Sequence, residues 1–262
     1  MNDTEQMDFL YELFDASLPR LGPGGESSTK KALDMLLSAR AEQKDKSVPK
    51  KLRILDIGCG NGAQTIELAK NIDGTIMAVD NHQPYLNELQ RRAKAEGVSK
   101  RIQPSLKDMR DLGLPECSFD LIWSEAALYN MGFREGLARC RLLLVPGGFL
   151  GVSELCWLRP DPPVECQVYF ANEYPAMKDI DTNLSIIQST GYKVVGHFTL
   201  PESDWWESYY HPLEDRLQSL RKKYVTDTER LAMIDSVCLE IDICRKYLGY
   251  YGYIFFMMQC SR

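Results

Sequence analysis

Residues 55–65, LDIGCGNGAQT, form the stretch of the sequence best suited to hold a cofactor. Gly58, Gly60 and Gly62 occupy alternate positions in it, directly after an apolar run that ends in the acid Asp56. Because glycine has no Cβ, a turn built from it allows a ligand to approach the backbone closely. We therefore expect a bound cofactor at this turn, and the charge of Asp56 bears on its identity.

Two cofactors fit the spacing of the glycines. A G-x-G-x-x-A pattern that ends at Ala63 suits a dinucleotide, whose pyrophosphate brings negative charge to a helix N-terminus. S-adenosylmethionine instead carries a sulfonium and an α-ammonium, so an acid at position 56 favours it. Asp80 ends the run TIMAVD and can accept from ribose hydroxyls of either cofactor, while Asp108 can accept from an adenine amino group. We expect S-adenosylmethionine, with NAD in an oxidoreductase as the less favoured alternative.

The elements that must position these residues alternate between short apolar runs and amphipathic runs. Strands are expected at RILDIGC, TIMAVD, RIQPSLKD, FDLIWSE and GFLGVSEL, and helices at GAQTIELAKN, PYLNELQRRAKAEG and FREGLARCRLLL. This alternation is typical of parallel βαβ units with helices on both faces of the sheet. It predicts an α/β, doubly wound, Rossmann-like fold whose ligands bind at the carboxyl ends of the strands.

The flanking segments are predicted to be mostly helical. Helical spacing covers residues 5–18 and 27–40 before the alternating region. After it we expect a helix over 164–190, a strand at YKVVGHFTL, a largely helical stretch over 202–248 and a final strand at GYIFFMMQC. The length suits a single domain, residues 1–262. We divide it into an N-terminal helical cap (1–50), a cofactor-binding core (51–156) and a substrate-side part (157–262).

Residues 53–156 resemble the class I S-adenosylmethionine-dependent methyltransferases of the small-molecule type. The motifs LDIGCGNG, AVD, KDMRDLGLPECSFDLIWSEAAL and LLLVPGGFLGVSE follow one another at the separations typical of that family. The resemblance implies a seven-stranded, mostly parallel sheet with an antiparallel last strand, and methyl transfer to a small-molecule acceptor. The expected cofactor-binding residues in this region are Asp56, Gly58, Gly60, Asn61, Asp80, Asn81, Asp108, Met109 (through its backbone), Ser124 and Glu125.

The segment RLGPGG near the N-terminus resembles a loop found in a bacterial and archaeal branch of these enzymes. In that branch a Gly-Pro-Gly turn closes over the methionine end of the cofactor. The resemblance adds Gly22 and Gly24 to the expected cofactor-binding residues. The alternative is an ordinary turn between two helices, in which Pro and Gly are equally common.

Methyl transfer by in-line displacement needs alignment and exclusion of water more than a strong catalyst. A base matters only when the nucleophile arrives protonated. Glu125 and Tyr129 are four residues apart in SEAALYN, where the family places the methyl group, and His211 has a side chain that titrates near neutrality. We expect these three as catalytic residues; the alternatives are a cap, a packing residue and a structural histidine.

Aromatic residues near the C-terminus predict a lid over a small acceptor. In PESDWWESYYHPLEDRL, Trp205 pairs with Tyr209 and Trp206 with Tyr210 at helical spacing, and Pro212 should end that helix. The segment VYFANEYPAM offers similar side chains. Aromatic faces attract cations, so they suit a sulfonium or an amine. The expected substrate-binding residues are Glu154, Trp157, Tyr174, Trp205, Tyr209 and Tyr210.

Composition excludes several other classes. A net charge of -6 argues against a nucleic-acid substrate. The sequence has no apolar run long enough for a membrane span and no signal peptide at its start, so we expect a cytoplasmic protein. Eight cysteines without a CxxC pair predict free thiols, and three histidines predict no metal site. A homodimer stays open, as does a non-catalytic module that binds S-adenosylmethionine or S-adenosylhomocysteine.

Overall fold

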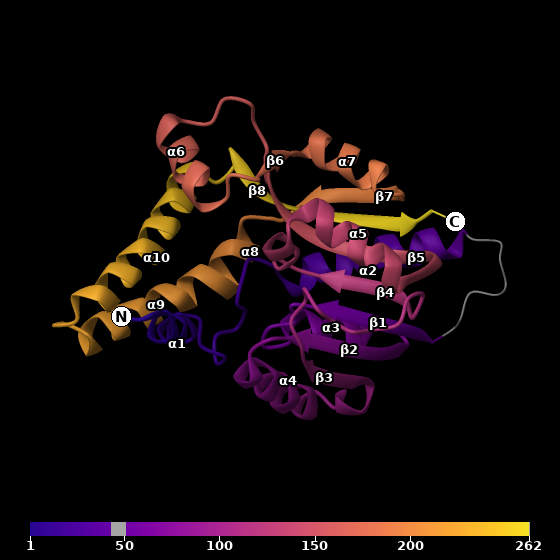
Figure 1. The fold of residues 1–262 in the computed structure, drawn as a ribbon, viewed down its shortest axis with the longest axis horizontal. Helices are drawn as coiled ribbons and strands as arrows, with labels where there is room; N and C mark the ends of the chain where they lie inside the picture. Colours follow the sequence, from indigo (N-terminus) through magenta and orange to yellow (C-terminus); the bar gives the residue numbers. More distant parts are fainter. Residues whose placement is uncertain (43–50, 262) are drawn as a thin grey trace.

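The computed structural model describes residues 1–42 and 51–261. Its sheet has the strand order β3-β2-β1-β4-β5-β8-β7, and the short β6 pairs with the end of β5. β8 is antiparallel to both of its neighbours, and the other strands run parallel to one another (Figure 1). The predicted α/β fold with an antiparallel last strand is confirmed. The strands are β1 (Leu52–Ile57), β2 (Gly74–Asp80), β3 (Ile102–Leu106), β4 (Phe119–Ser124), β5 (Leu144–Trp157), β6 (Lys178–Asp179), β7 (Tyr192–Thr199) and β8 (Tyr251–Cys260).

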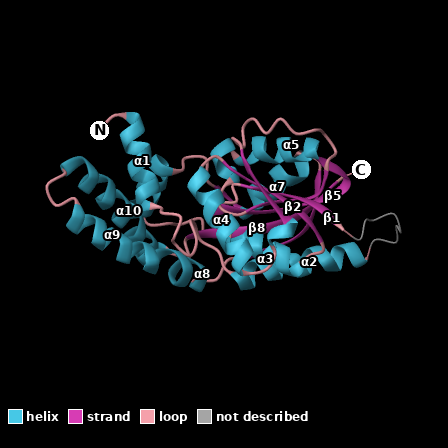
Figure 2. Ribbon diagram, turned by 90° about the horizontal axis from the view of Figure 1, so that it is seen from below, coloured by secondary structure: helices cyan, strands magenta, loops and turns pink. Residues whose placement is uncertain are grey.

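Helices cover both faces of this sheet because its strands are apolar on both sides. Ile54 packs with α2, α3 and α4, while the next residue, Leu55, packs with α5 and α7 on the other face. Figure 2 shows α2 and α3 on one side of the sheet and α5 on the other. The helices are α1 (Asp3–Leu13), α2 (Glu26–Ala41), α3 (Ala63–Asn71), α4 (Gln83–Ala95), α5 (Phe133–Leu143), α6 (Val164–Glu173), α7 (Ile180–Ser189), α8 (Ser203–Trp205), α9 (His211–Lys223) and α10 (Thr228–Tyr247), with short η1 (Ser99–Arg101), η2 (Leu128–Met131) and the π-helical η3 (Trp206–Tyr210).

A second group of helices stands beyond the carboxyl ends of the parallel strands. It contains α1 from the N-terminus together with α8, α9 and α10, the insertion between β7 and β8 (Figures 1 and 2). The predicted helical insertion between the last two strands is thus present. α6 joins the group from the connection that follows β5 and packs on α10. These helices lie where ligands of parallel sheets bind.

Two local predictions near the C-terminus are wrong. The helix expected over 164–190 is split into α6 and α7 by β6, because Pro175 disfavours a helical conformation at Tyr174, where φ is -144°. Pro212 does not end the aromatic helix; it lies in the first turn of α9, directly after the π-helical residues of η3. A π-helical turn changes the hydrogen-bond register, so it accommodates a residue that lacks the backbone N–H.

Two further sequence expectations concern the surface and the thiols. Among the described residues no helix combines the length and the apolar composition needed to cross a membrane. All eight cysteines are free thiols, and six of them are buried, as the absence of paired spacings predicts.

We predict that a cavity created in the core of this sheet lowers the stability of the protein. Leu150 lies in the middle of β5 and is 0% exposed, whereas Leu142 on α5 is 53% exposed. Leu150→Ala should lower the free energy of unfolding by about 2–5 kcal/mol, because the buried site loses both contacts and packing density. The control Leu142→Ala should change it by about 0.5 kcal/mol or less. Urea unfolding followed by circular dichroism measures both, and equal losses in the two variants would contradict the described core.

Candidate active site

A cavity of about 630 Å³ lies at the carboxyl ends of the parallel strands. One end is lined by the glycine turn after β1 and by the loops that follow β2, β3 and β4. The other end is lined by aromatic residues of α6, η3 and β8 and by one acid of α10. α1 and the loop that follows it cover the space between the two ends. A cofactor and a second molecule can therefore meet within one enclosed volume.

The glycine turn forms the floor of the first end. Gly58 has φ +69°, and a Cβ built on it would collide with the Cβ of Ala127. Gly60 has φ +53°, and a Cβ there would lie 3.0 Å from Cδ1 of Leu21. Both positions therefore need glycine for conformation and for space. The turn thus packs closely on Ala127 and Leu21, and its residues line the cavity.

Two predicted acids stand at the ends of the next strands. Asp80 accepts hydrogen bonds from the amide N–H groups of Gly60 (2.9 Å) and His82 (3.0 Å), one on each carboxylate oxygen. Burial raises the pKa of Asp80 above its ordinary value. Each oxygen has a second lone pair for a ligand hydroxyl. Asp108 accepts from the amide of Arg110 (2.8 Å) and also lines the cavity. Asn61, Asn81 and Met109 line the same end.

Three predicted cofactor residues do not reach the cavity. Asp56 is fully buried beneath the glycine turn, where it accepts from Oγ1 of Thr65 (2.6 Å). Burial raises the pKa of Asp56 to about 7. The hydroxyl of Ser124 donates to the carbonyl of Ile57 (2.9 Å) and so joins β4 to β1. Gly24 donates its amide to the carbonyl of Asp204 (3.0 Å) outside the cavity lining. Asp56 and Ser124 are thus structural: their side chains satisfy buried partners.

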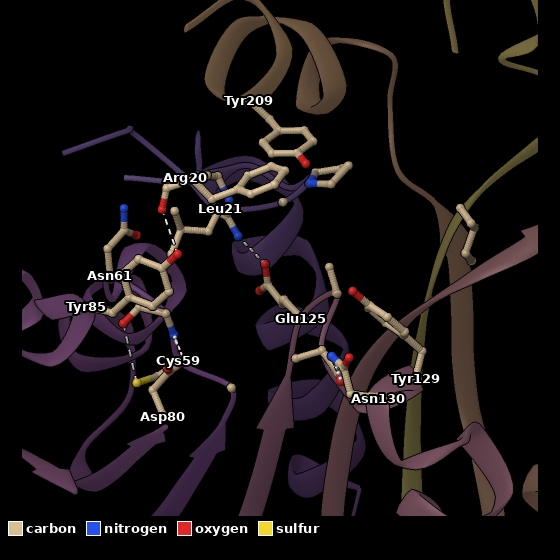
Figure 3. Close-up of a pocket in the computed structure, with 18 of the residues that line it drawn as sticks. Arg20, Leu21, Cys59, Asn61, Asp80, Tyr85, Glu125, Tyr129, Asn130 and Tyr209 are labelled. Atoms are coloured by element: carbon tan, nitrogen blue, oxygen red, sulfur yellow. Dashed lines mark hydrogen bonds and ion pairs between the residues drawn. The ribbon is translucent and has the colours of Figure 1, made fainter. Parts of the chain in front are cut away.

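Glu125 is the centre of a buried polar network. It forms an ion pair with Arg20, and both side chains are less than a tenth exposed. Oε1 of Glu125 also accepts from the hydroxyl of Thr29 (2.8 Å) and from the indole N–H of Trp123 (2.9 Å). Figure 3 shows Arg20 and Glu125 pointing at each other across the cavity. Because these donors engage both carboxylate oxygens, Glu125 holds the site together and is poorly placed to take a proton from a substrate.

The loop between α1 and α2 is fastened over the cofactor end. Nδ2 of Asn61 donates to the carbonyls of Ala16 (3.1 Å) and Leu18 (2.7 Å), and Arg92 donates to that of Pro19 (2.9 Å). Gly22 and Pro23 of the Gly-Pro-Gly turn line the cavity, and Gly22 packs against Ala126. Ala126 itself has φ +49°, a conformation that costs a residue with a Cβ roughly 1–2 kcal/mol.

Aromatic side chains enclose the other end of the cavity. Tyr174 donates its hydroxyl to Oε1 of Glu154, and Tyr210 donates to Oε1 of Glu240 (2.8 Å). Tyr129 keeps 40% of its surface exposed and meets the ring of Tyr174 edge to face. Tyr209 lies above Arg20 and Leu21 in Figure 3, while Tyr129 lies at the side of Glu125. The rings that line this end are Tyr129, Tyr169, Phe170, Tyr174, Trp205, Tyr209, Tyr210, Tyr251 and Tyr253.

Three other predicted residues lie away from the cavity. His211 is exposed at the start of α9, outside the cavity lining, and its ring lies tilted against that of Trp206, so it is not placed to act as a base. Trp157 supports the wall indirectly, through an edge contact with Phe170. Glu154 is buried behind Tyr174, and its Oε2 has no hydrogen-bond partner. Burial raises the pKa of Glu154 to about 7.

Several residues that line the cavity were not predicted from the sequence. Tyr11 and Tyr85 reach the cofactor end from α1 and α4, and Tyr85 donates to the carbonyl of Phe14 (2.6 Å). Arg20 was not expected to pair with Glu125, although it lies two residues before the Gly-Pro-Gly segment. Glu240 was also missed; the available signal was an acid between two aliphatic residues on a helix.

Comparison with known proteins agrees with this geometry. Residues 54–148 match the family model described as a methyltransferase domain. A sterol 24-C-methyltransferase of Neurospora crassa is 24% identical over 184 residues, which cover 66% of this chain and 48% of that protein. The 27-O-demethylrifamycin SV methyltransferase of Amycolatopsis mediterranei is 32% identical over 111 residues, 42% of this chain and 40% of that protein. The chain therefore spans about half the length of the curated relatives it matches or less.

Solved structures extend the likeness to nearly the whole chain. The crystal structure of an S-adenosylmethionine-dependent methyltransferase from Geobacter sulfurreducens, in complex with S-adenosyl-L-homocysteine, superposes with a TM-score of 0.76. It is 18% identical, and the match covers 97% of this chain and 98% of that one. At this identity the likeness concerns the fold.

Residues 54–148 thus form a methyltransferase domain. The predicted methyltransferase domain is confirmed for residues 54–148, and the superposition confirms the predicted fold for nearly the whole chain. The narrower assignment to a branch with a Gly-Pro-Gly loop stays a prediction.

We predict that removing Arg20 destabilises the protein strongly. Arg20→Met leaves the buried Glu125 carboxylate without its cation, which should lower the free energy of unfolding by about 3–5 kcal/mol. Adding Glu125→Gln to this variant should restore most of the loss, since no charge is then buried unpaired. The control Arg159→Met breaks an exposed pair with Asp161 and should cost about 1 kcal/mol or less. Chemical unfolding measures all three, and a small loss in Arg20→Met would refute the network.

We predict a pH effect on stability from Glu154. Its pKa of about 7 lies above the ordinary value, so the folded state favours the protonated acid. The resulting stabilisation is present at low pH and is lost as the pH rises through about 7. Glu154→Gln mimics the protonated acid and can still accept a hydrogen bond from Tyr174, so its unfolding free energy should fall less as the pH rises. Part of the fall should persist in this variant, because the pKa of Asp56 is raised in the same way. Unfolding free energies at about pH 5 and about pH 8 test this. Parallel profiles for the two proteins would contradict it.

Proposed function

We propose that this protein is an enzyme that transfers a methyl group from S-adenosylmethionine to a small molecule bound in the same cavity. The observation that carries the proposal is the continuity of that cavity. It joins a glycine turn with two strand-end acids, suited to a nucleoside, to an end lined by aromatic rings. A module that only stored the cofactor would need no second compartment, so the space beside the cofactor end favours catalysis over the non-catalytic alternative.

The residues of the first end fit S-adenosylmethionine. The turn of Gly58 and Gly60 lines the cavity, and Asp80 offers free lone pairs to two ribose hydroxyls. We assign Asp108 and the backbone of Met109 to the adenine, with Asn61 and Asn81 beside the sugar and the turn. The Gly-Pro-Gly loop, through Gly22, is proposed to close over the methionine end. When bound, the cofactor supplies a methyl group that a sulfonium makes electrophilic.

The chain contributes alignment and exclusion of water to the reaction. The loop over the cofactor end is anchored by Arg20 and Asn61, and α6, η3 and α10 cover the acceptor end. Tyr129 lines the junction, and burial raises its pKa, so its hydroxyl stays protonated and can hold an acceptor by a hydrogen bond. Tyr174, Trp205, Tyr209 and Tyr210 are proposed to bind the acceptor directly. Glu154 acts behind Tyr174, as a positioning residue.

The homodimer considered from the sequence finds no support in the comparisons, and the proposed reaction does not require it.

We predict that Asp80 decides cofactor affinity. Isothermal titration calorimetry should detect S-adenosylmethionine and S-adenosylhomocysteine, and Asp80→Ala should weaken both on the order of 100-fold, since each hydrogen bond to a carboxylate contributes about 1.5–3 kcal/mol. The control Asp111→Ala removes an exposed acid of a loop at the same sheet edge and should bind normally. Because Asp80 also holds the turn, circular dichroism must show that Asp80→Ala is still folded at the temperature of the titration.

NADH serves as the competing ligand in the same experiment. Binding of NADH without either sulfur compound would replace the proposal by the oxidoreductase alternative. Binding of the sulfur compounds that Asp80→Ala leaves unchanged would place the cofactor elsewhere in the molecule.

A further inference from the structure

We propose that the aromatic end of the cavity binds the acceptor as a small organic cation, a protonated amine, with the Glu240 carboxylate as its counter-charge. This inference rests on the proposed methyl transfer, because it names the acceptor class of the same cavity. Three observations carry it: the position of Glu240, the distribution of charge along the cavity wall, and the aromatic rings around the carboxylate.

Glu240 reaches the cavity from α10 and lies at the centre of the aromatic wall. Its carboxylate accepts a hydrogen bond from the hydroxyl of Tyr210 (2.8 Å). Burial is the main cause of the raised pKa of six tyrosines, and the charge of Glu240 adds to the rise. These tyrosines come from four different elements. They are Tyr129, Tyr169, Tyr209, Tyr210, Tyr251 and Tyr253. Burial also raises the pKa of Glu240 itself, and the nearby charge of Glu173 adds to the rise.

Charge is distributed unevenly along the cavity wall. Lys107 and Arg110 follow β3 at the cofactor end, and Arg20 already has an ion-pair partner. At the aromatic end the described lining residues include Glu173 and Glu240 but no lysine or arginine. An anionic acceptor would therefore meet two acids without a counter-charge. A cationic acceptor supplies the missing charge, so this wall selects for it and against an anion.

The aromatic rings add a second attraction for a cation. The rings of Tyr209 and Tyr210 are 4.7 Å apart, and those of Trp205 and Tyr253 are 5.4 Å apart, so several faces meet in a small volume. A cation within about 6 Å of such a face is attracted by its quadrupole, most strongly where water is excluded. The buried tyrosines stay un-ionised, because their pKa values are raised. Aromatic faces and one central carboxylate together match an ammonium group.

The chemistry of methyl transfer is compatible with an acceptor that arrives protonated. An ammonium nitrogen has no free lone pair, so one N–H proton first passes to the Glu240 carboxylate. The nitrogen lone pair then forms the bond to the methyl carbon. The bond from that carbon to sulfur breaks, and its electron pair stays on sulfur. The products are the N-methylated ammonium ion, a neutral thioether and the protonated Glu240 carboxyl, so charge and atoms balance.

The test compares a cation with a neutral molecule of the same shape. Protein saturated with S-adenosylhomocysteine, which fills the cofactor end, is titrated calorimetrically with choline and with 3,3-dimethylbutan-1-ol, its uncharged carbon analogue. We expect choline to bind at least about tenfold more tightly, because a desolvated cation gains from both the rings and the carboxylate. Glu240→Gln keeps the shape of the side chain and its bond from Tyr210, and it should weaken choline about tenfold while leaving the alcohol unchanged.

Controls separate this inference from the proposed function. Asp34→Asn removes the same charge from an exposed position on α2 and should bind choline like the unmodified protein. Equal affinities for choline and the alcohol, an unchanged choline affinity in Glu240→Gln, or no choline binding at millimolar concentration would each overturn the cationic acceptor. Failure of S-adenosylhomocysteine to bind at the outset would instead refute the proposed methyl transfer.

Discussion

The ion pair between Arg20 and Glu125 is the interaction on which the arrangement of the site depends. Both side chains are buried, so neither charge is tolerable without the other. Glu125 stands at the end of β4, fixed by the indole of Trp123, whereas Arg20 belongs to the loop after α1. Their pairing brings that loop onto the glycine turn, with Leu21 against Gly60. The cavity exists as an enclosed volume because the chain's N-terminal segment is held there.

The same loop connects the core to the helices of the acceptor side. Gly24 donates to the carbonyl of Asp204 and accepts from the hydroxyl of Ser208 (2.9 Å), both in or next to the insertion between β7 and β8. Gly25 has no room for a Cβ, which would collide with the Asp204 carboxylate. Parts of the chain that are far apart in sequence therefore meet at one loop. A shift of the loop must alter the cofactor end and the acceptor end together, which suits a reaction that needs both molecules aligned.

The cofactor end could be predicted from the sequence because local rules specify it. Apolar periodicity identifies the parallel strands, topology puts their carboxyl ends together, and glycine reports backbone that only glycine adopts. Asp80 and Asp108 follow directly from those rules. Asp56 and Ser124 show the limit of these local rules, because the side chain of a residue at a strand end can point to the ligand or into the core. Side chains of successive residues in a strand point to opposite faces, and the motif alone does not indicate which of them is hydrogen-bonded in the core.

The acceptor end was harder to predict because tertiary packing specifies it. Helical spacing identified Trp205 and Tyr209, but it assumes a regular helix, and the π-helical turn of η3 offsets the residues that follow; His211 accordingly lies outside the cavity. Glu240 comes from α10, whose sequence carries no motif. One fold hosts many functions, so the acceptor must be inferred from the charges and rings that packing assembles. Here packing assembles the Glu240 carboxylate among un-ionised tyrosines. A bound cation would supply the positive charge that no lining lysine or arginine provides at this end.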